Sequence, residues 1–495
     1  MNYDAVVIGG GISGMTSAIL LARKGSRVAL LESSEQLAPV VRGFSRSGLR
    51  FDTGFHYAGG LGDGGILDGL FHHLGLATKI VKTTYAKEGF DLLRSPASPQ
   101  DFAFPCGFER VQEQLQARHP REKGAIRSYL ATLRSECDKL PYLNLERPFT
   151  PQPLLTLQQG PSLLQFLDDL TPSRGLKQLL SLHAFLHGVP PAQIPLTLHA
   201  CVVAPYFEST CGIQGGGRAL VEAYRERLTE LGVDIQTGQR VNRIELGHGG
   251  KFSAVHTATG ERVAGNQCIS SVAPQTLLGL IPEGAFRPVF RKRLAKLEET
   301  PSAHLLFAAC SDDSLLEKRN LFLAGDGDHP FADLKKTPPE QRTLYLAKAH
   351  ADTDNPTRKG LVAICPADQS ETAAWKGSRR GQRPETYNTF KQQTMNRLQR
   401  RIETLCPELG SLTPLEGSTP LTLSDYAGNS GGGIYGVKHK IGQYNPQPVT
   451  RVAGLLLAGQ GTAAPGILGA TLSAYLCCGH LLGHDTLRDE VKRCS

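Results

Sequence analysis

A glycine-rich hexapeptide near the N-terminus has the residue types and spacing of a phosphate-binding turn. It reads Gly9-Gly10-Gly11-Ile12-Ser13-Gly14 and matches the pattern G-x-G-x-x-G. Gly9 permits a tight turn, Gly11 leaves space for a pyrophosphate, and Gly14 allows a helix to pack closely on a strand. Further on, Glu32 can accept hydrogen bonds from ribose hydroxyls, and an acid at this point disfavours a 2′-phosphate. The motif therefore predicts a site for FAD or NAD in preference to NADP.

The segments around this turn have the pattern of a β-α-β unit. Ala5 to Ile8 is a short apolar run that predicts a buried parallel strand, and a helix is expected from Ser13 to Lys24. A second strand is expected from Arg27 to Leu31, which places Glu32 at its end. The main-chain amides of Ile12 and Ser13 would then lie at a helix N-terminus, where the helix dipole favours phosphate.

A second strand, glycine loop and helix are predicted near the C-terminus. Leu455 to Ala458 is an apolar run, and Gly459-Gln460-Gly461 follows it directly. An apolar helix is then expected to open within Pro465-Gly466-Ile467-Leu468-Gly469-Ala470. The free N–H groups at the start of this helix would favour negative charge in the same way as those of the first unit.

Four further segments carry a resemblance to a known family: Val40-Val41-Arg42-Gly43-Phe44, Phe51-Asp52-Thr53-Gly54 followed by His56-Tyr57, Gly212 to Arg218, and Gly431-Gly432-Gly433-Ile434-Tyr435-Gly436. With the two glycine units, they resemble the phytoene desaturase and flavin amine oxidase superfamily. The resemblance is greatest to the branch of all-trans-retinol saturases and carotenoid cis–trans isomerases (prolycopene isomerase). The sequence departs from the family pattern at Val40 and Val41, which stand near expected glycines, and at Gly461, where relatives often carry an acid.

The resemblance implies a non-covalently bound FAD and assigns residues to it. Arg42, Gly43 and Gly54 would touch the cofactor, and the backbone at Val241 would hold the adenine. Gly459 and Gln460 would support the ribityl chain. The C-terminal helix would direct its N-terminus at the pyrimidine side of the flavin, where reduced flavin carries negative charge, through Gly466, Ile467, Gly469 and Ala470.

The resemblance also implies which polar side chains lie near the flavin ring. These are His56, Tyr57, Tyr426 and Tyr435, as proton donors or as groups that orient the substrate. For each of them, structural packing is the alternative interpretation. No metal site is predicted: His183 and His187 are four residues apart on an expected helix, but without a nearby acid or a third ligand.

Length and pattern predict an α/β protein of two discontinuous domains. The first is an FAD-binding Rossmann-like domain, of the glutathione reductase and p-hydroxybenzoate hydroxylase type, made of residues 1–74, 207–284 and 426–495. The second is a mixed α+β substrate domain made of residues 75–206 and 285–425. Leu154 to Leu198 is strongly apolar, which suits a helical core, a lining for a long apolar substrate, or a surface that dips into a membrane.

The expected activity follows from the resemblance and from the absence of a Ser/His/Asp set in the sequence. We expect an FAD-dependent oxidoreductase that acts on carbon–carbon double bonds of a long apolar polyene or isoprenoid, carotenoid-like or retinoid-like. Saturation, desaturation and cis–trans isomerisation stay open. No second nicotinamide-binding loop stands out, so NAD(P)H would act only as a transient external reductant, or another carrier would serve.

Two other functions fit the same fold. A flavin amine oxidase would be expected to have an aromatic cage that faces the flavin. The only tryptophan, Trp375, lies in a polar, basic stretch, which disfavours this function. A non-redox escort that binds prenyl lipids, similar to the GDP dissociation inhibitors, is disfavoured because Gly9, Gly11, Gly14 and Glu32 are all present.

Composition narrows the partners and the compartment. The formal net charge of +8 over 495 residues is a mild bias that does not argue for nucleic acid. Eleven cysteines without a CxxC pair indicate a reducing compartment. With no signal peptide or apolar span visible, we expect a cytoplasmic protein. The basic run between Lys376 and Arg401 suits a solvated helix face, or attraction to the inner face of a membrane.

Overall fold

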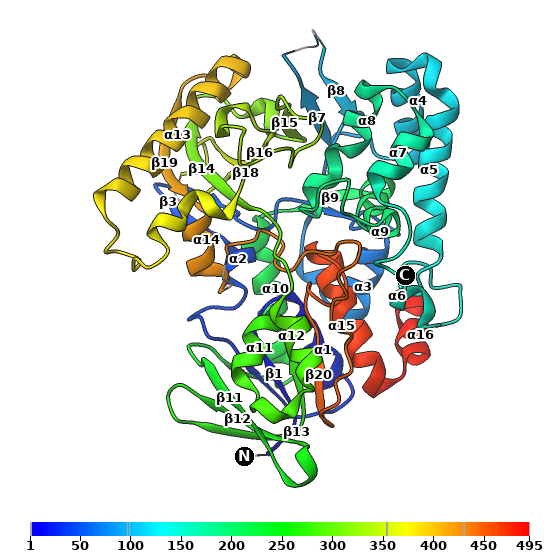
Figure 1. Cartoon of the computed structure of the whole chain (residues 1–495), viewed down its shortest axis with the longest axis vertical. Coiled ribbons are helices and arrows are strands. Elements are labelled where there is room, and N and C mark those ends of the chain that lie inside the picture. The colour runs from blue at the N-terminus through cyan, green and yellow to red at the C-terminus, as the bar shows by residue number, and fades with distance from the viewer. Residues whose placement is uncertain (1, 97, 99, 353–354, 429–430, 495) are drawn as a thin grey trace.

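The computed structural model describes residues 2–494 except 97, 99, 353–354 and 429–430 (Figure 1). The predicted domain segments begin at Met1 and end at Ser495, and both of these residues lie outside the described part. The chain forms two large sheets with helices packed around them. The first sheet lies in the lower half of Figure 1 and the second in the upper half.

The first sheet is built around the N-terminal strand. Its strand order is β10-β2-β1-β13-β12-β11, with β20 on β13 as a further neighbour. The pairs β10–β2, β2–β1, β1–β13 and β13–β20 are parallel, and β11 and β12 add an antiparallel hairpin. The bounds are β1 (Asn2–Ile8), β2 (Val28–Leu31), β10 (Asp234–Gln236), β11 (Val241–Leu246), β12 (Phe252–Thr257), β13 (Arg262–Ser270) and β20 (Leu455–Leu457). This parallel sheet confirms the predicted Rossmann-like class.

Helices from both ends of the chain cover one face of this sheet. The first, α1 (Ile12–Ala22), packs against α15 (Gly466–Leu482), and side chains of both helices belong to one hydrophobic cluster. α10 (Gly216–Glu230) adds Leu220 and Tyr224 to the same cluster. The apolar residues that predicted these helices are the ones that bury this face. Smaller helices near this sheet are α3 (Ile66–Leu74), α11 (Pro274–Leu280), α12 (Pro288–Ala295) and α16 (His484–Cys494).

The second sheet is mixed, and its strands come from two separate parts of the chain. Its order is β19-β14-β18-β16-β15-β7-β8, in which only β15–β7 is a parallel pair. The bounds are β7 (Asp91–Arg94), β8 (Phe102–Phe104), β14 (Ser302–Cys310), β15 (Asn320–Leu323), β16 (Leu344–Lys348), β18 (Gly360–Ala367) and β19 (Leu412–Ser418). The predicted domain boundaries at residues 74, 206, 284 and 425 stay predictions.

The two faces of the second sheet pack against different partners. Alternate side chains of β14 face opposite sides of the sheet. Leu306 and Ala308 belong to the hydrophobic cluster that includes residues of α13 (Glu385–Leu405), whereas Leu305 and Phe307 belong to the hydrophobic cluster of the helical region. This helical region is drawn in cyan and green at the upper right of Figure 1. It consists of α4 (Phe108–Arg118), α5 (Lys123–Asp138), α6 (Gln152–Leu155), α7 (Leu163–Leu170), α8 (Arg174–Ser181) and α9 (Leu196–Glu208).

Several predicted boundaries are wrong by a few residues. The helix expected from Ser13 to Lys24 begins at Ile12 and ends at Ala22, and the strand expected from Arg27 begins at Val28. His183 and His187 do not share an α-helix: His183 lies in the 3-10 helix η3 (Leu182–Leu186), and His187 follows it. Short strands and helices connect the two sheets, namely α2 (Pro39–Arg42), β3 (Phe44–Arg46), β4 (Leu49–Phe51), β5 (Ala58–Gly59), β6 (Lys82–Thr84), β9 (Thr210–Ile213), β17 (His350–Ala351) and α14 (Pro420–Ala427).

Candidate functional site

The turn between β1 and α1 has an open side and a packed side. A Cβ atom on Gly11 would meet nothing within 4 Å, whereas one on Gly14 would lie 1.9 Å from the carbonyl oxygen of Gly9. Gly9 itself has a φ of +101°, which disfavours other residues. α1 has no side-chain cap and no acid in its first turn, so its first amides receive no hydrogen bond from a capping side chain. The geometry fits an anionic group beside Gly11.

Glu32 follows β2 directly and lies beside this turn. Its carboxylate accepts hydrogen bonds from the amide of Gly10 at 2.7 Å and from the amide of Ser34 at 2.8 Å. The Ser33 hydroxyl donates a third bond to this carboxylate at 3.2 Å. A carboxylate offers about four acceptor positions, so these three bonds leave capacity for one more hydroxyl donor. The carbonyl oxygen of Glu32 accepts from the amide of Gln239 at 2.8 Å, which brings the segment leading to Val241 alongside. Val241 opens β11, is buried, and pairs with Thr257.

The second glycine unit lies beside the first. The φ angles of Gly459 and Gly466 are +114° and +79°. A Cβ atom on Gly469 would lie 2.3 Å from the carbonyl oxygen of Ala464, so the start of α15 is tightly packed. Like α1, α15 begins without a side-chain cap or an acid in its first turn. The Ser13 hydroxyl donates to the carbonyl oxygen of Ala470 at 2.7 Å and so links the two helices.

Ser271 lies between the two glycine loops, a position that sequence reasoning missed. Its hydroxyl donates to the carbonyl oxygens of Ile8 and Gly9 at 3.0 and 3.1 Å. A Cβ atom on Gly459 would come within 3.2 Å of the Ser271 carbonyl oxygen. No local signal marks this serine, because its role depends on strands that are distant in sequence.

The remaining residues assigned to the cofactor have varied surroundings. Arg42 ends α2, and its guanidinium donates to the Gln36 side chain. Gly43 has a φ of +68° and packs against the carbonyl of Phe51, while Gly54 packs against Val40. The carbonyl oxygen of Gln460 accepts from Nε2 of His439 at 2.6 Å. Ile467, in the first turn of α15, lines an apolar cavity.

A wide cleft of about 640 Å³ runs from this region to the surface between α13 and α14. Gly43, Gly54 and His56 line one part of it, and Ile434 and Tyr435 contribute further contacts. The Nε2 atom of His56 is buried and has no hydrogen-bond partner among the described residues. Burial lowers the pKa of His56 to about 4, so the ring is neutral at neutral pH. His56 thus brings a neutral ring nitrogen without a hydrogen-bond partner among the described residues to the lining of the cleft.

The hydroxyl of Tyr57, unlike Nε2 of His56, has a hydrogen-bond partner among the described residues. The hydroxyl donates to Asp91 at 2.9 Å. Asp91 also interacts with Nε2 of His183 at 3.0 Å and accepts from the side-chain Nδ2 of Asn320 at 2.9 Å. Asp91 is fully buried. The prediction that His183 has no nearby acid is therefore wrong, because β7 brings Asp91 to it from far away in sequence. Asp91 stands within the apolar run Phe90 to Leu93, and an acid in such a run is a sequence signal for a buried polar contact.

Tyrosine rings gather around Tyr57. The ring centroids of Tyr206, Tyr85 and Tyr345 lie 5.0, 5.8 and 6.1 Å from that of Tyr57. The ring of His56 lies 5.4 Å from Tyr345, whose hydroxyl is buried without a hydrogen-bond partner among the described residues. Burial raises the pKa of Tyr57 and Tyr345 well above 10. The sequence argument from tryptophan alone missed this aromatic cluster.

The other two predicted tyrosines lie in different environments. Tyr426 is 48% exposed, and the guanidinium of Arg380 lies 4.5 Å above its ring. Tyr435 is half-buried, contacts Gly188, and has its pKa raised by burial. The structure therefore brings His56 and Tyr435 to the cleft interior, and it leaves Tyr426 at the cleft surface.

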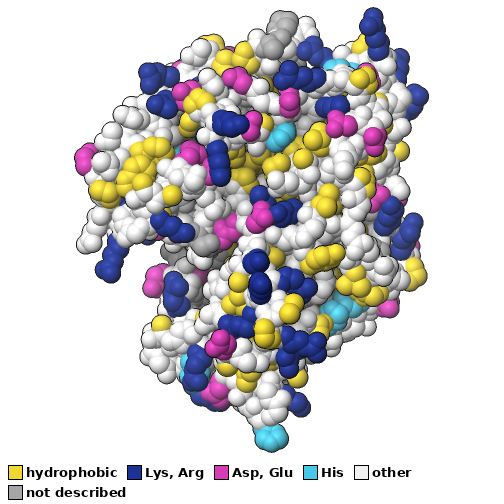
Figure 2. All heavy atoms as spheres, viewed as in Figure 1, with side chains coloured by type: hydrophobic (Ala, Val, Ile, Leu, Met, Phe, Trp, Pro, Cys, Tyr) yellow, Lys and Arg dark blue, Asp and Glu magenta, His cyan; other side chains and the backbone are white. Residues whose placement is uncertain are grey.

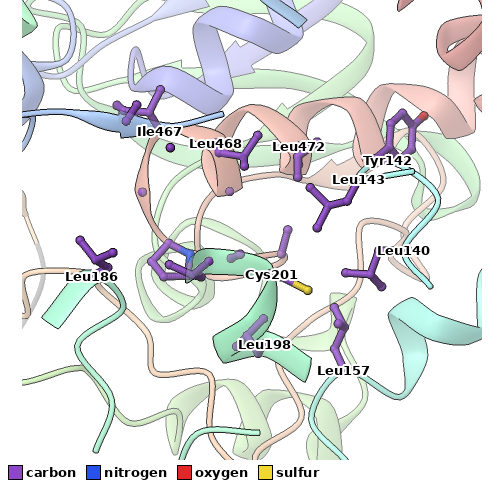
Figure 3. A pocket seen from close by; sticks show the side chains of 18 of the residues that line it. Leu140, Tyr142, Leu143, Leu157, Leu186, Leu198, Cys201, Ile467, Leu468 and Leu472 are labelled. Atoms are coloured by element: carbon purple, nitrogen blue, oxygen red, sulfur yellow. The ribbon is translucent and has the colours of Figure 1, made fainter. Parts of the chain in front are cut away.

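A second, apolar cavity of about 70 Å³ adjoins the start of α15. Figure 3 shows Ile467, Leu468 and Leu472 of α15 facing leucines of the helical region across this space. Its leucines include Leu140, Leu143, Leu157 and Leu198. None of the described residues that line the cavity carries a charge.

Neither a metal cluster nor a membrane-crossing helix is found in the described residues. Within 2–494, apart from the gaps given above, no group of three or more His, Cys, Asp and Glu side chains could hold a metal ion. Over the same residues, each helix is too short or too polar to cross a bilayer.

A parallel sheet with two strand–glycine loop–helix units at one edge defines a dinucleotide-binding α/β protein. The family of flavin-containing amine oxidoreductases matches residues 12–482, and this chain belongs to that family. The chain is thus a flavin oxidoreductase, and the predicted membership of the superfamily is confirmed.

Relatives with assigned activities cover nearly the whole chain. All-trans-retinol 13,14-reductase of Rattus norvegicus is 25% identical over 99% of this chain and 87% of its own length. Hydroxyneurosporene desaturase of Cereibacter sphaeroides is 27% identical over 93% of both chains. Among solved structures, an oxidoreductase from Methanosarcina mazei has a TM-score of 0.68 at 16% identity, covering 95% of this chain and 98% of its own. Putrescine oxidase bound to putrescine has a TM-score of 0.64 at 15% identity, covering all of both chains, and shares the fold.

Membership of this family implies FAD, and the residues present fit it. The space beside Gly11 can take a pyrophosphate, and the uncapped starts of α1 and α15 offer amides to negative charge. The Glu32 carboxylate retains acceptor capacity for a ribose hydroxyl. Bound FAD would supply hydride or electron transfer.

Proposed function

We propose that this protein is an FAD-dependent oxidoreductase that acts on carbon–carbon double bonds of a long apolar polyene or isoprenoid. The similarity to all-trans-retinol 13,14-reductase, 25% identity over 99% of the chain, carries this proposal. The similarity to hydroxyneurosporene desaturase supports the same substrate class. Both relatives are named for reactions at double bonds of long apolar molecules.

The apolar cavity beside α15 supports an uncharged substrate chain. Leucine is the most frequent residue in its lining, and none of the lining side chains offers a counter-ion for an ammonium group. In the cleft, the neutral ring of His56 offers Nε2 either to orient the substrate or to exchange a proton with it. Tyr435 lies in the same cleft and is the second group proposed to contact the substrate.

The proposed activity can be tested on the purified protein with its flavin. The flavin is reduced anaerobically and mixed with a panel of polyenes that includes all-trans-retinol and cis and trans carotenes. Products are separated by mass and double-bond geometry. A gain of two hydrogens indicates saturation, and an unchanged mass with altered geometry indicates isomerisation. With oxidised flavin, a loss of two hydrogens indicates desaturation. Testing NADH and NADPH as reductants examines the predicted external donor.

Amine oxidation is the second candidate, because tyrosine rings gather around Tyr57 beside the cleft. Aerobic incubation with putrescine and with aromatic amines, followed by a hydrogen peroxide assay, tests it. Peroxide released by amines, with every polyene unchanged, would replace the polyene proposal. The Gly11→Val protein, purified without flavin, is the control for reactions that do not need the cofactor.

A further inference from the structure

Arg383 carries a buried donor without a partner at the cleft wall. Its side chain is only 8% exposed, and Nη2 pairs with Asp425 of α14. Its Nη1 atom is buried and has no hydrogen-bond partner among the described residues. A guanidinium has five N–H donors, and a buried donor left unpaired is unfavourable because it has lost its hydrogen bonds to water. An acceptor from outside the chain would satisfy this position.

The Arg383 guanidinium is held rigidly in place. Arg383 lies two residues before α13, and its guanidinium is 4.8 Å above the ring of Tyr387. The Tyr387 hydroxyl is within 2.9 Å of the Thr419 hydroxyl and 3.2 Å of the Thr422 hydroxyl. These contacts anchor the stacked ring to the start of α14. A guanidinium fixed in this way loses little conformational entropy when it binds a ligand.

The surroundings of Arg383 are positively charged. Four cations and two carboxylates line the cleft, an excess of two positive charges: Arg46, Arg380, Arg383 and Lys391 against Glu416 and Asp425. Glu416 is shared by Lys391 at 2.9 Å and Arg46 at 3.8 Å. Arg380 stacks on Tyr426 and forms no ion pair with another described residue. In Figure 2, Lys and Arg side chains lie along the notch below the lobe that carries α13.

The same cleft becomes apolar toward its buried end. Arg380 and Tyr426 are exposed, whereas Phe185 and Leu305 are buried. Ile364 and Ile434 extend the apolar part. A ligand that matches both ends has an anionic group at Arg383 and an apolar body directed toward His56. The cleft volume of about 640 Å³ lies within the range that is usual for small-molecule binding sites.

We propose that Arg383 binds the anionic end group, a carboxylate or a phosphate, of a substrate whose apolar chain lies in the inner cleft. This inference rests on the proposed function and narrows it to polyenes or isoprenoids with one charged end. Nη1 of Arg383 donates to the anion, and Arg380 adds attraction at the surface. Asp425 keeps the other side of the guanidinium in position.

The test compares probes that share a chain and differ at the end group. All-trans-retinoic acid is compared with all-trans-retinol, and geranylgeranyl phosphate with geranylgeraniol. Binding to the flavin-loaded protein is followed by the fluorescence of Trp375, the only tryptophan, whose ring lies 5.7 Å from that of Tyr387. Loss of a charge-assisted hydrogen bond corresponds to a change of about tenfold or more in Kd. We expect the acid or the phosphate to bind at least tenfold more tightly than its alcohol.

Variants assign the effect to Arg383. Arg383→Gln should remove most of the preference for the anionic probe and leave the affinity for the alcohol within about twofold. Arg383→Lys keeps the charge and should retain part of the preference. Arg400→Gln is the matched control, because Arg400 is an exposed cation on α13 that does not line the cleft. Thermal unfolding of each variant identifies any loss of folding.

The outcomes separate this inference from the proposed function. Equal binding of acid, phosphate and alcohols by the unchanged protein overturns the anionic site, even if the polyenes are converted. An equal loss for acid and alcohol in Arg383→Gln assigns Arg383 a structural role and also overturns it. If no polyene or isoprenoid binds or reacts while amines release peroxide, the proposed function fails as well.

Discussion

The Ser13 hydroxyl donates a 2.7 Å hydrogen bond to the carbonyl oxygen of Ala470, which lies 457 residues further along the chain. This bond joins the first turn of α1 to the first turns of α15, and both helices direct uncapped N-termini to the same region. The relative position of the two uncapped helix ends thus depends on a side chain within the glycine motif itself.

Ser13→Ala should loosen this junction. The bond is partly buried, so its loss should lower the free energy of unfolding by about 0.5–1.5 kcal/mol and should weaken FAD binding. Urea unfolding and flavin release on dilution measure the two effects. Ser17→Ala is the control, because the Ser17 hydroxyl donates only to the carbonyl of Ser13 within α1. If both variants release flavin equally, the link to Ala470 has no special role.

Gly11→Val and Gly14→Val should fail in different ways. The side chain at 11 enters the open space, so the protein should fold and purify without its yellow flavin. At position 14 a Cβ atom would lie 1.9 Å from the Gly9 carbonyl oxygen, so the protein should unfold or aggregate. Circular dichroism and the absorbance of bound flavin distinguish the two. Gly124→Val, at an exposed position of α5, controls for added bulk. A Gly11→Val protein with stoichiometric FAD would show that the phosphates lie elsewhere.

Tyr57→Phe should reduce stability more than turnover. It removes one of three partners from the fully buried Asp91, at a cost of about 1–3 kcal/mol in the free energy of unfolding. His56→Gln should show the opposite pattern, because Nε2 of His56 has no partner among the described residues. Denaturant unfolding and single-turnover flavin oxidation by a polyene measure both quantities. Tyr426→Phe, at the exposed tyrosine, is the control. Normal turnover in His56→Gln would remove His56 from the reaction.

Mild acid should destabilise the fold through its buried histidines, two of which form a pair that can be tested. The amide of Val189 donates to Nδ1 of His187, and Nε2 of His187 lies 3.0 Å from Nδ1 of His199. This arrangement requires both rings to be neutral. Burial lowers the pKa of His187 to about 3 and that of His199 well below 6.5.

The direction of the pH effect follows from these shifts. Below pH 6.5 the unfolded chain takes up protons that the folded rings do not, so stability falls by about 1.4 kcal/mol per pH unit for each ring, until the folded pKa is reached. Urea unfolding at pH 7, 6 and 5 measures the slope. His187→Asn should reduce this slope by the contribution of one ring. The exposed His248→Gln should leave the slope unchanged. An identical slope in His187→Asn would contradict this account.

Local patterns in the sequence were sufficient to predict the elements of the two glycine units. Gly9 and Gly11 lie between β1 and α1, and Gly14 lies in the first turn of α1, as predicted, because the requirements of a tight turn and of apolar periodicity act within a few residues. The strand at Leu455 and the helix at Gly466 followed from the same reasoning. The family resemblance lay in these short segments too.

Contacts between distant residues were decided by the tertiary structure alone. Ser271 between the glycine loops, Asp91 beneath Tyr57, and Arg383 against Asp425 all depend on strands and helices that meet only in the folded chain. Burial, and with it the lowered pKa of His56 and the unpaired Nη1 of Arg383, is a property of that packing. A sequence specifies which groups are available, whereas their neighbours and their access to water are determined by the fold.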